Sequence, residues 1–129
     1  MTTKSNKAIV SRFFEEVFNK RNLALVDEFV SPNFINYNSS MQVRGAEGVK
    51  RAIMAQFEAF PDIHTTIEDI IAEGDKVVVR ARDRFSQQRD GKRVELTWIE
   101  IIRLEDGKLA EAWVEADMRP IHQLAGEYK

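Results

Sequence analysis

The strongest constraint on the fold is a long hairpin pattern near the carboxyl end of the chain. Two runs of alternating residues, Lys92–Leu104 and Leu109–Asp117, flank the dipeptide Asp106-Gly107. Asp-Gly between strand-like runs is a strong local signal for a tight β-hairpin, because both positions accept a positive φ. A tight turn also sets the strand register, so the residues that face one another can be counted outward from it.

Counting outward from this turn predicts which hairpin residues share a face. On one face Glu100 lies opposite Trp113. On the same face Trp98 lies opposite Glu115, and Asp117 ends the second strand. The other face is almost purely apolar and carries Ile99, Ile101, Ala112, Val114 and Ala116. We therefore predict a face of tryptophans and carboxylates that either meets solvent or lines a pocket.

Helical periodicity dominates the first third of the chain, where Ile9, Phe13 and Val17 recur at every fourth position. A second, short helix is expected to end before Pro32, because the residue before a proline is pushed out of the α region. A third helix is predicted from about Ala46 to Phe60, and it also ends before a proline.

Strand patterns occupy most of the remaining chain. A short hairpin is expected over Phe34–Val43, and two longer strands over His64–Ile71 and Lys76–Phe85. Helices followed by a meander of antiparallel strands predict one α+β domain over residues 1–129. Because helices cannot cover a curved sheet completely, we expect a cone-shaped pocket between the helices and the sheet.

Three arginines alternate with other residues in the strand predicted over Lys76–Phe85. Arg80, Arg82 and Arg84 share a face, and the simplest interpretation is a solvent-facing row opposite the preceding strand. The alternative interpretation is a binding site for anions.

Composition and missing motifs argue against several classes of function. A net charge of −2, a pI near 5.7 and no long apolar run argue against nucleic-acid or membrane partners. The absence of cysteine and of a signal-peptide pattern suits a cytoplasmic protein. His64 and His122 are far apart and no nucleotide-binding motif occurs, so we predict neither a metal nor a cofactor.

Two carboxylates on the tryptophan face are candidates for acid/base chemistry. In an apolar pocket the pKa of Asp117 would rise, which would let it exchange a proton with a carbon acid. The alternative is a structural lock that ties Asp117 to a backbone amide or to Arg119. If Glu100 faces inward it is a second acid/base group, whereas an ion pair or a strand bend would make it structural.

Other side chains are candidates to assist at the pocket. His64 and Asp83 are both expected to face inward. They form either a pair that orients substrate or acts as a base, with His64 as a catalytic candidate, or a satisfied core pair. Tyr37 and Asn36 could donate hydrogen bonds to an enolate oxygen at the pocket mouth, although the same residue types favour turns. The apolar wall is predicted to consist of Trp98, Trp113, Phe14 and Phe18.

The apolar face of the last hairpin needs a cover of its own. If helices cover the tryptophan face, then Ile99, Ile101 and Val114 require another sheet to pack against. The simplest source is a second copy of the chain, which predicts a symmetric homodimer.

Several short motifs are spread along nearly the whole chain: FPD, IED and EGD, then GK and DGK around the hairpin, and W-x-x-x-D followed by QL-G. Together they resemble the SnoaL-like polyketide cyclases of the nuclear-transport-factor-2-like superfamily. The resemblance implies a cone of curved antiparallel sheet and helices, a dimer or larger assembly, and intramolecular aldol ring closure without metal or cofactor. It also implies that Asp117, four residues after Trp113, is the acid/base residue.

The chain departs from many members of that family where Asn36 and Tyr37 replace an aspartate-histidine pair. We therefore consider three functions. The first is a cofactor-independent cyclase or isomerase that acts on a small apolar carbonyl compound. The second is a non-catalytic protein that binds a small hydrophobic ligand, and the third is mainly a dimerising module.

Overall fold

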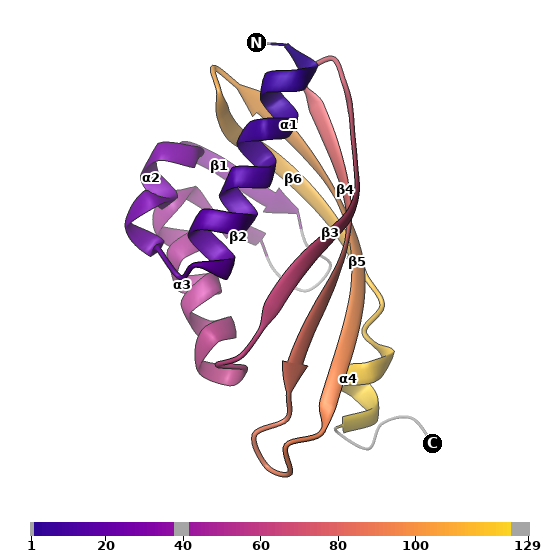
Figure 1. Ribbon diagram of the computed structural model, residues 1–129. Coiled ribbons are helices and arrows are strands. Elements are labelled where there is room, and N and C mark those ends of the chain that lie inside the picture. The colour runs from indigo at the N-terminus through magenta and orange to yellow at the C-terminus, as the bar shows by residue number, and fades with distance from the viewer. Residues whose placement is uncertain (1, 38–41, 125–129) are drawn as a thin grey trace.

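The computed structural model describes residues 2–37 and 42–124, which form a six-stranded sheet with α1, α2 and α3 on one side (Figure 1). The helical segments are α1 (Thr3–Arg12), η1 (Phe13–Asn19), η2 (Leu23–Leu25), α2 (Val26–Phe29), α3 (Gly45–Ala59) and α4 (Arg119–Leu124). The strands are β1 (Val30–Tyr37), β2 (Gln42–Arg44), β3 (His64–Glu73), β4 (Lys76–Ser86), β5 (Arg93–Glu105) and β6 (Lys108–Ala116). The turn expected between the strands of the Phe34–Val43 hairpin lies outside the described residues. None of the described helices is long and apolar enough to cross a membrane.

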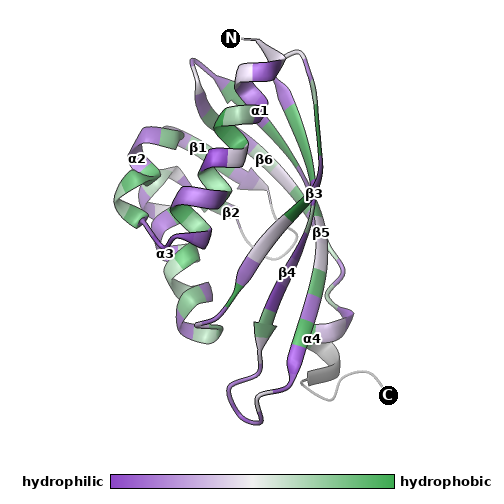
Figure 2. Ribbon diagram, in the orientation of Figure 1, coloured by the Kyte–Doolittle hydropathy of each residue, from purple (hydrophilic) through white to green (hydrophobic). Residues whose placement is uncertain are grey.

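The strands lie in the order β2-β1-β6-β5-β4-β3. The α+β fold predicted from the sequence is confirmed. One pair differs from the expected antiparallel meander, because β1 runs parallel to β6 while the other neighbouring pairs are antiparallel. Hydrophobic and hydrophilic residues alternate along β5, as a strand with two different faces requires (Figure 2).

A bulge in β6 shifts the register of the last hairpin. Leu104 faces Leu109 as counted from the turn, but the next pair joins Arg103 to Glu111, so Ala110 is the extra residue. Leu109 and Ala110 are both buried, and a bulge lets two consecutive apolar residues turn inward. The pairs predicted beyond this point are therefore wrong by one residue.

The shifted register changes which residues of β6 face the helices. Val114, not Trp113, lies opposite Glu100, and Trp113 lies opposite Ile101. The prediction that both tryptophans share a face is wrong, because Trp98 lies on the inner face and Trp113 on the outer face. Val114 likewise lies on the inner face and not on the predicted partner surface.

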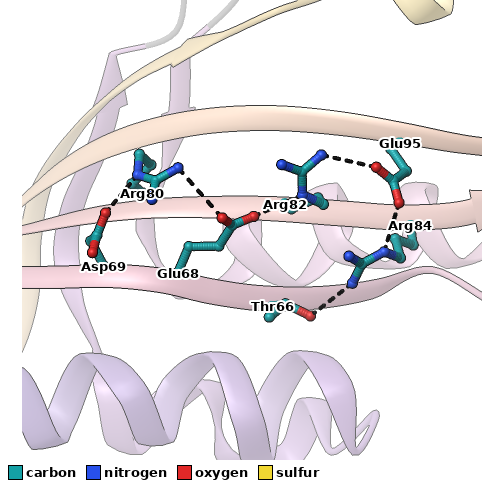
Figure 3. Close-up of polar contacts among 7 residues, drawn as sticks. All are labelled: Thr66, Glu68, Asp69, Arg80, Arg82, Arg84 and Glu95. Carbon is teal, nitrogen blue, oxygen red and sulfur yellow. Dashed lines mark hydrogen bonds and ion pairs between the residues drawn. The ribbon is translucent and has the colours of Figure 1, made fainter.

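A second bulge lies in β3, where Glu68 is the extra residue between two regular pairs. It leaves Glu68 and the neighbouring Asp69 both within reach of the arginines on the outer face of β4. Figure 3 shows the resulting ladder, in which three arginines alternate with carboxylates along the strands. The arginine row therefore lies on the solvent side of the sheet, as its alternation predicted.

The hydrophobic core lies between the inner face of the sheet and the helices. Val10 of α1 and Val17 of η1 are fully buried, and so are Val77, Val79 and Ile102 from β4 and β5. Burial of a side chain of this size stabilises the fold by about 1.5–3 kcal/mol.

The largest fully buried side chain is Phe85, whose ring centroid lies 4.0 Å from that of Phe60. Phe85→Ala is expected to lower the free energy of unfolding by about 3–5 kcal/mol, because it leaves a cavity. Urea unfolding measures this, with Met54→Ala at an exposed position of α3 as the matched control. A loss below about 1 kcal/mol, the ordinary effect of a substitution, would contradict this packing.

Candidate functional site

The inner face of the sheet carries two carboxyl side chains, Asp83 on β4 and Glu100 on β5. Asp83 lies opposite Leu96, and Glu100 lies opposite Val79. Between these two rows lies Trp98, which shares the same face of β5 because strand residues alternate. The two carboxyl groups, which we call the interior carboxyls, therefore flank an indole ring.

Asp83 is 9% exposed and is held by a donor from the neighbouring strand. The Thr65 hydroxyl of β3 donates a hydrogen bond to Asp83 Oδ1 at 2.6 Å. Burial raises the pKa of Asp83, while Thr65, the Trp98 indole and the nearby His64 act in the opposite direction. Burial is the larger effect, so the pKa of Asp83 stays above its ordinary value.

Glu100 is partly buried, and among the described residues no hydrogen-bond partner for its carboxyl group is found. Burial, followed by the negative charge of Asp83, raises the pKa of Glu100 to about 8. Glu100 is therefore mostly protonated at neutral pH. Near pH 8 it can both donate and accept a proton, which is the property required of an acid/base group.

Apolar side chains account for the burial of Glu100. Val79 of β4 and Val114 of β6 lie opposite it on the two neighbouring strands. Phe14 of η1 packs on Trp98, with ring centroids 5.4 Å apart. This aromatic pair covers the inner face beside the interior carboxyls.

Asn36 brings an amide group to the same face from β1, where it lies opposite Ala112. Its Oδ1 atom is buried and has no hydrogen-bond partner among the described residues.

Phe18 packs against Phe57 with ring centroids 5.3 Å apart and is almost fully buried, so it belongs to the core. The predicted site residues that share the inner face of the sheet, or pack on it, are Asp83, Trp98, Glu100, Asn36 and Phe14, which we call the interior site.

Tyr37 and Trp113 lie on the other face of the sheet. Their rings stack across β1 and β6 with centroids 5.5 Å apart. The Tyr37 hydroxyl donates to Glu111 at 3.1 Å, and this hydrogen bond is the main reason that the pKa of Tyr37 is raised. Asn36 and Tyr37 are neighbours in one strand, so they point to opposite faces.

Contrary to the expectation from the sequence, His64 does not face inward beside Asp83. It pairs with Arg84 on the outer face, and the next residue, Thr65, lies opposite Asp83. That prediction is wrong because side chains alternate along β3, and those of Thr65 and Ile67, not that of His64, point inward. The alternation of Thr65 with Ile67 is the signal that could have identified Thr65 from the sequence.

Asp117 follows the last residue of β6 and is paired with Arg119. Its carboxylate accepts hydrogen bonds from the Arg119 backbone N–H at 3.1 Å and from the guanidinium group at 2.9 and 2.7 Å. These bonds lower the pKa of Asp117 to about 2. The geometry is that of the structural lock, which the sequence left open as one of two interpretations.

Within the part of the chain that the structure describes, no group of three or more His, Asp or Glu side chains could hold a metal ion. The chemistry that the inner face offers is proton transfer by the carboxyl group of Glu100 in an apolar environment.

Comparison with solved structures gives close matches over nearly the whole chain. AclR from Streptomyces galilaeus, a proposed hydroxylase, is 26% identical with a TM-score of 0.86, covering 99% of this chain and 89% of AclR. TsrD from Streptomyces laurentii is 26% identical with a TM-score of 0.85, covering 99% of each chain. A proposed SnoaL-like polyketide cyclase from Jannaschia sp. CCS1 is 25% identical with a TM-score of 0.85, covering 94% of this chain and 91% of that one.

A search of curated proteins gives no match. The sequence itself matches the family of SnoaL-like polyketide cyclases over residues 8–123. That range contains all six strands, the second half of α1, and the whole of η1, α2 and α3. The chain therefore belongs to the SnoaL-like polyketide cyclase family and has the nuclear-transport-factor-2-like fold.

Proposed function

We propose that this chain is a cofactor-independent enzyme that moves a proton at a small apolar carbonyl compound, in an aldol ring closure or an enolisation. The observation that carries the proposal is Glu100, a carboxyl group in an apolar interior with a pKa of about 8. A group whose pKa lies near the working pH is suited to take a proton from carbon and to return it.

Two residues of the interior site, Glu100 and Asn36, take part in the reaction that we propose. Ionised Glu100 removes a proton from the carbon beside the carbonyl, and the negative charge moves to the carbonyl oxygen. The amide of Asn36 donates a hydrogen bond to that oxygen. In an isomerisation Glu100 returns the proton to a new carbon. In a ring closure the enolate carbon attacks a second carbonyl of the same molecule, and Glu100 protonates the resulting alkoxide.

The resemblance of the sequence to its family suggests Asp117 as an alternative base. That assignment requires Asp117 to leave Arg119, because a carboxylate with a pKa of about 2 is a weak base. We therefore assign the proton exchange to Glu100, and we assign to Asp117 the task of fixing the end of β6 to the start of α4.

The test is solvent deuterium exchange, followed by proton NMR in D2O across a panel of cyclic and aryl ketones. We expect the signal of protons beside the carbonyl to disappear faster with the protein than with buffer, at a rate that rises toward pH 8. Ligands that bind without any faster exchange would overturn the proposal and favour the second function, a non-catalytic binding protein. The replacement of the family's aspartate-histidine pair by Asn36 and Tyr37 is the observation that favours this second function.

We also propose that the outer face of the sheet packs against a second copy of the chain. Large apolar side chains are exposed there, namely Ile71, Ile99, Ile101 and Trp113. Beside them the arginine ladder is already paired with Glu68, Asp69 and Glu95 (Figure 3). Three arginines and three carboxylates leave no net charge, so a partner can cover the ladder without burying an unpaired ion.

Ile101→Arg is expected to convert the dimer into a monomer at micromolar concentration. The substitution places an unpaired guanidinium group, and its symmetry mate, in the proposed interface, which costs several kcal/mol. Analytical ultracentrifugation measures the change, with Met54→Arg on α3 as the control that keeps the dimer. An unchanged chain that is monomeric at this concentration would contradict both the dimer and the idea of a dimerising module.

A further inference from the structure

A groove of about 310 Å³ lies between the helical segments α1 and η1 on one side and the start of β3 on the other (Figure 1). Its lining includes Ser11, Phe14, Glu15, His64, Thr65 and Thr66. This volume lies at the lower end of the range of small-molecule pockets, about 300–1,000 Å³.

Two lining residues connect the groove to the interior site. Phe14 lines the groove and packs on Trp98, and Thr65 lines the groove and donates its hydrogen bond to Asp83. The side chains of Phe14 and Thr65 therefore stand between the groove and the interior carboxyls.

The backbone that carries Phe14 is unusual. Residues Phe13–Asn19 form a π-helix, in which the Lys20 N–H donates to the carbonyl of Glu15. π-Helical turns are rare and are frequently found at functional sites. The far end of this segment is fixed, because the Asn19 amide makes two hydrogen bonds of 2.9 Å with the backbone of Thr65.

The groove and the interior site differ in chemistry. The interior site is enclosed by Val79, Val114 and aromatic rings, whereas Ser11, Glu15 and Asn19 bring hydroxyl, carboxylate and amide groups to the helix side of the groove. Side chains of these types both donate and accept hydrogen bonds, and the ring of Phe14 offers an apolar surface beside them. This combination suits a hydroxyl-rich group such as a sugar.

We propose that the groove is the outer half of a divided ligand site. The hydroxyl-rich end of the ligand lies in the groove, and its apolar, carbonyl-bearing end passes Phe14 to reach Glu100. This inference rests on the proposed function, because it takes Glu100 as the reacting end. Phe14 then determines which ligands pass, and Ser11 and Glu15 hold the part that stays outside.

Trp98 provides a direct test of the passage. In a Trp113→Phe background, Trp98 is the remaining tryptophan, and acrylamide quenching of its fluorescence reports access to the interior site. We expect Ser11→Tyr, which fills the groove, to lower the quenching constant several-fold and Phe14→Ala to raise it. Ala8→Tyr, at an exposed position of α1 that does not line the groove, is the matched control and should leave quenching unchanged.

A second measurement tests the ligand class independently of turnover. The probes are 4-hydroxyacetophenone and its glucoside, followed by amide chemical shifts and by titration. We expect the glucoside to shift the signals of Ser11 and Glu15 as well as the Trp98 indole, and Ser11→Tyr to weaken its binding about tenfold. Unchanged quenching and equal affinity for both probes in Ser11→Tyr would overturn the divided site. Loss of proton exchange in Glu100→Gln is a separate result that concerns the proposed function alone.

Discussion

Glu100→Gln is expected to reduce the rate of proton exchange by about 10²–10⁴-fold, the usual contribution of a general acid/base group. Glutamine has the size and shape of glutamate, so the apolar packing around position 100 is kept. It cannot take or release a proton near pH 8, which is the property that the burial of Glu100 creates. Solvent deuterium exchange on the best ketone of the panel measures the loss, and circular dichroism checks that the fold is retained.

Asp117→Asn is the comparison that separates the two candidate bases. If Asp117 only locks the strand end to Arg119, its replacement weakens that ion pair and leaves most of the exchange rate intact. The reverse pattern, with full exchange in Glu100→Gln and none in Asp117→Asn, would show that Asp117 is the base. The proposed role of Glu100 would then be wrong.

The Asp106-Gly107 turn and the alternation of β5 were sufficient to predict one half of the interior site. Trp98 and Glu100 share a face of β5, and Ile99 and Ile101 share the other, as counted. The faces of β6 could not be counted, because the bulge at Ala110 contains neither glycine nor proline to mark it. The only local signal is that two apolar residues follow one another where strict alternation expects one.

The pairing of charges was only partly predictable. The alternation in β4 places Arg82 and Arg84 on the face opposite Asp83, so these arginines cannot neutralise the interior carboxyls. The pair of Asp117 and Arg119 is local, and it could be named from the sequence as one of two alternatives. The raised pKa of Glu100 could not, because it depends on side chains that four different segments bring to one place.

The ionisation of Glu100, which the proposed activity requires, is expected to lower the stability of the fold. Its pKa is about 8 in the folded chain against an ordinary value of 4.5, so the folded state holds a proton that the unfolded state releases. The free energy of unfolding therefore falls as pH rises between these two values, by about 1.4 kcal/mol per pH unit at most. Across the whole window the loss amounts to about 3–5 kcal/mol.

Glu100→Gln removes this titration and is expected to be more stable than the unchanged chain by about 3–5 kcal/mol at about pH 9, and by little at about pH 4. Urea unfolding at one protein concentration across this range measures the difference. Glu115→Gln, which makes the same chemical change at an exposed position on the outer face of β6, is the matched control.

The two results on Glu100 constrain each other. A carboxyl group that costs the fold several kcal/mol at alkaline pH is the kind of destabilising residue found where activity requires it. A variant that gains stability and loses exchange would fit an acid/base role held at the expense of the fold. If the stability difference between Glu100→Gln and the unchanged chain were the same at every pH, Glu100 would titrate normally in the folded state. The proton-transfer proposal would then lose its physical basis.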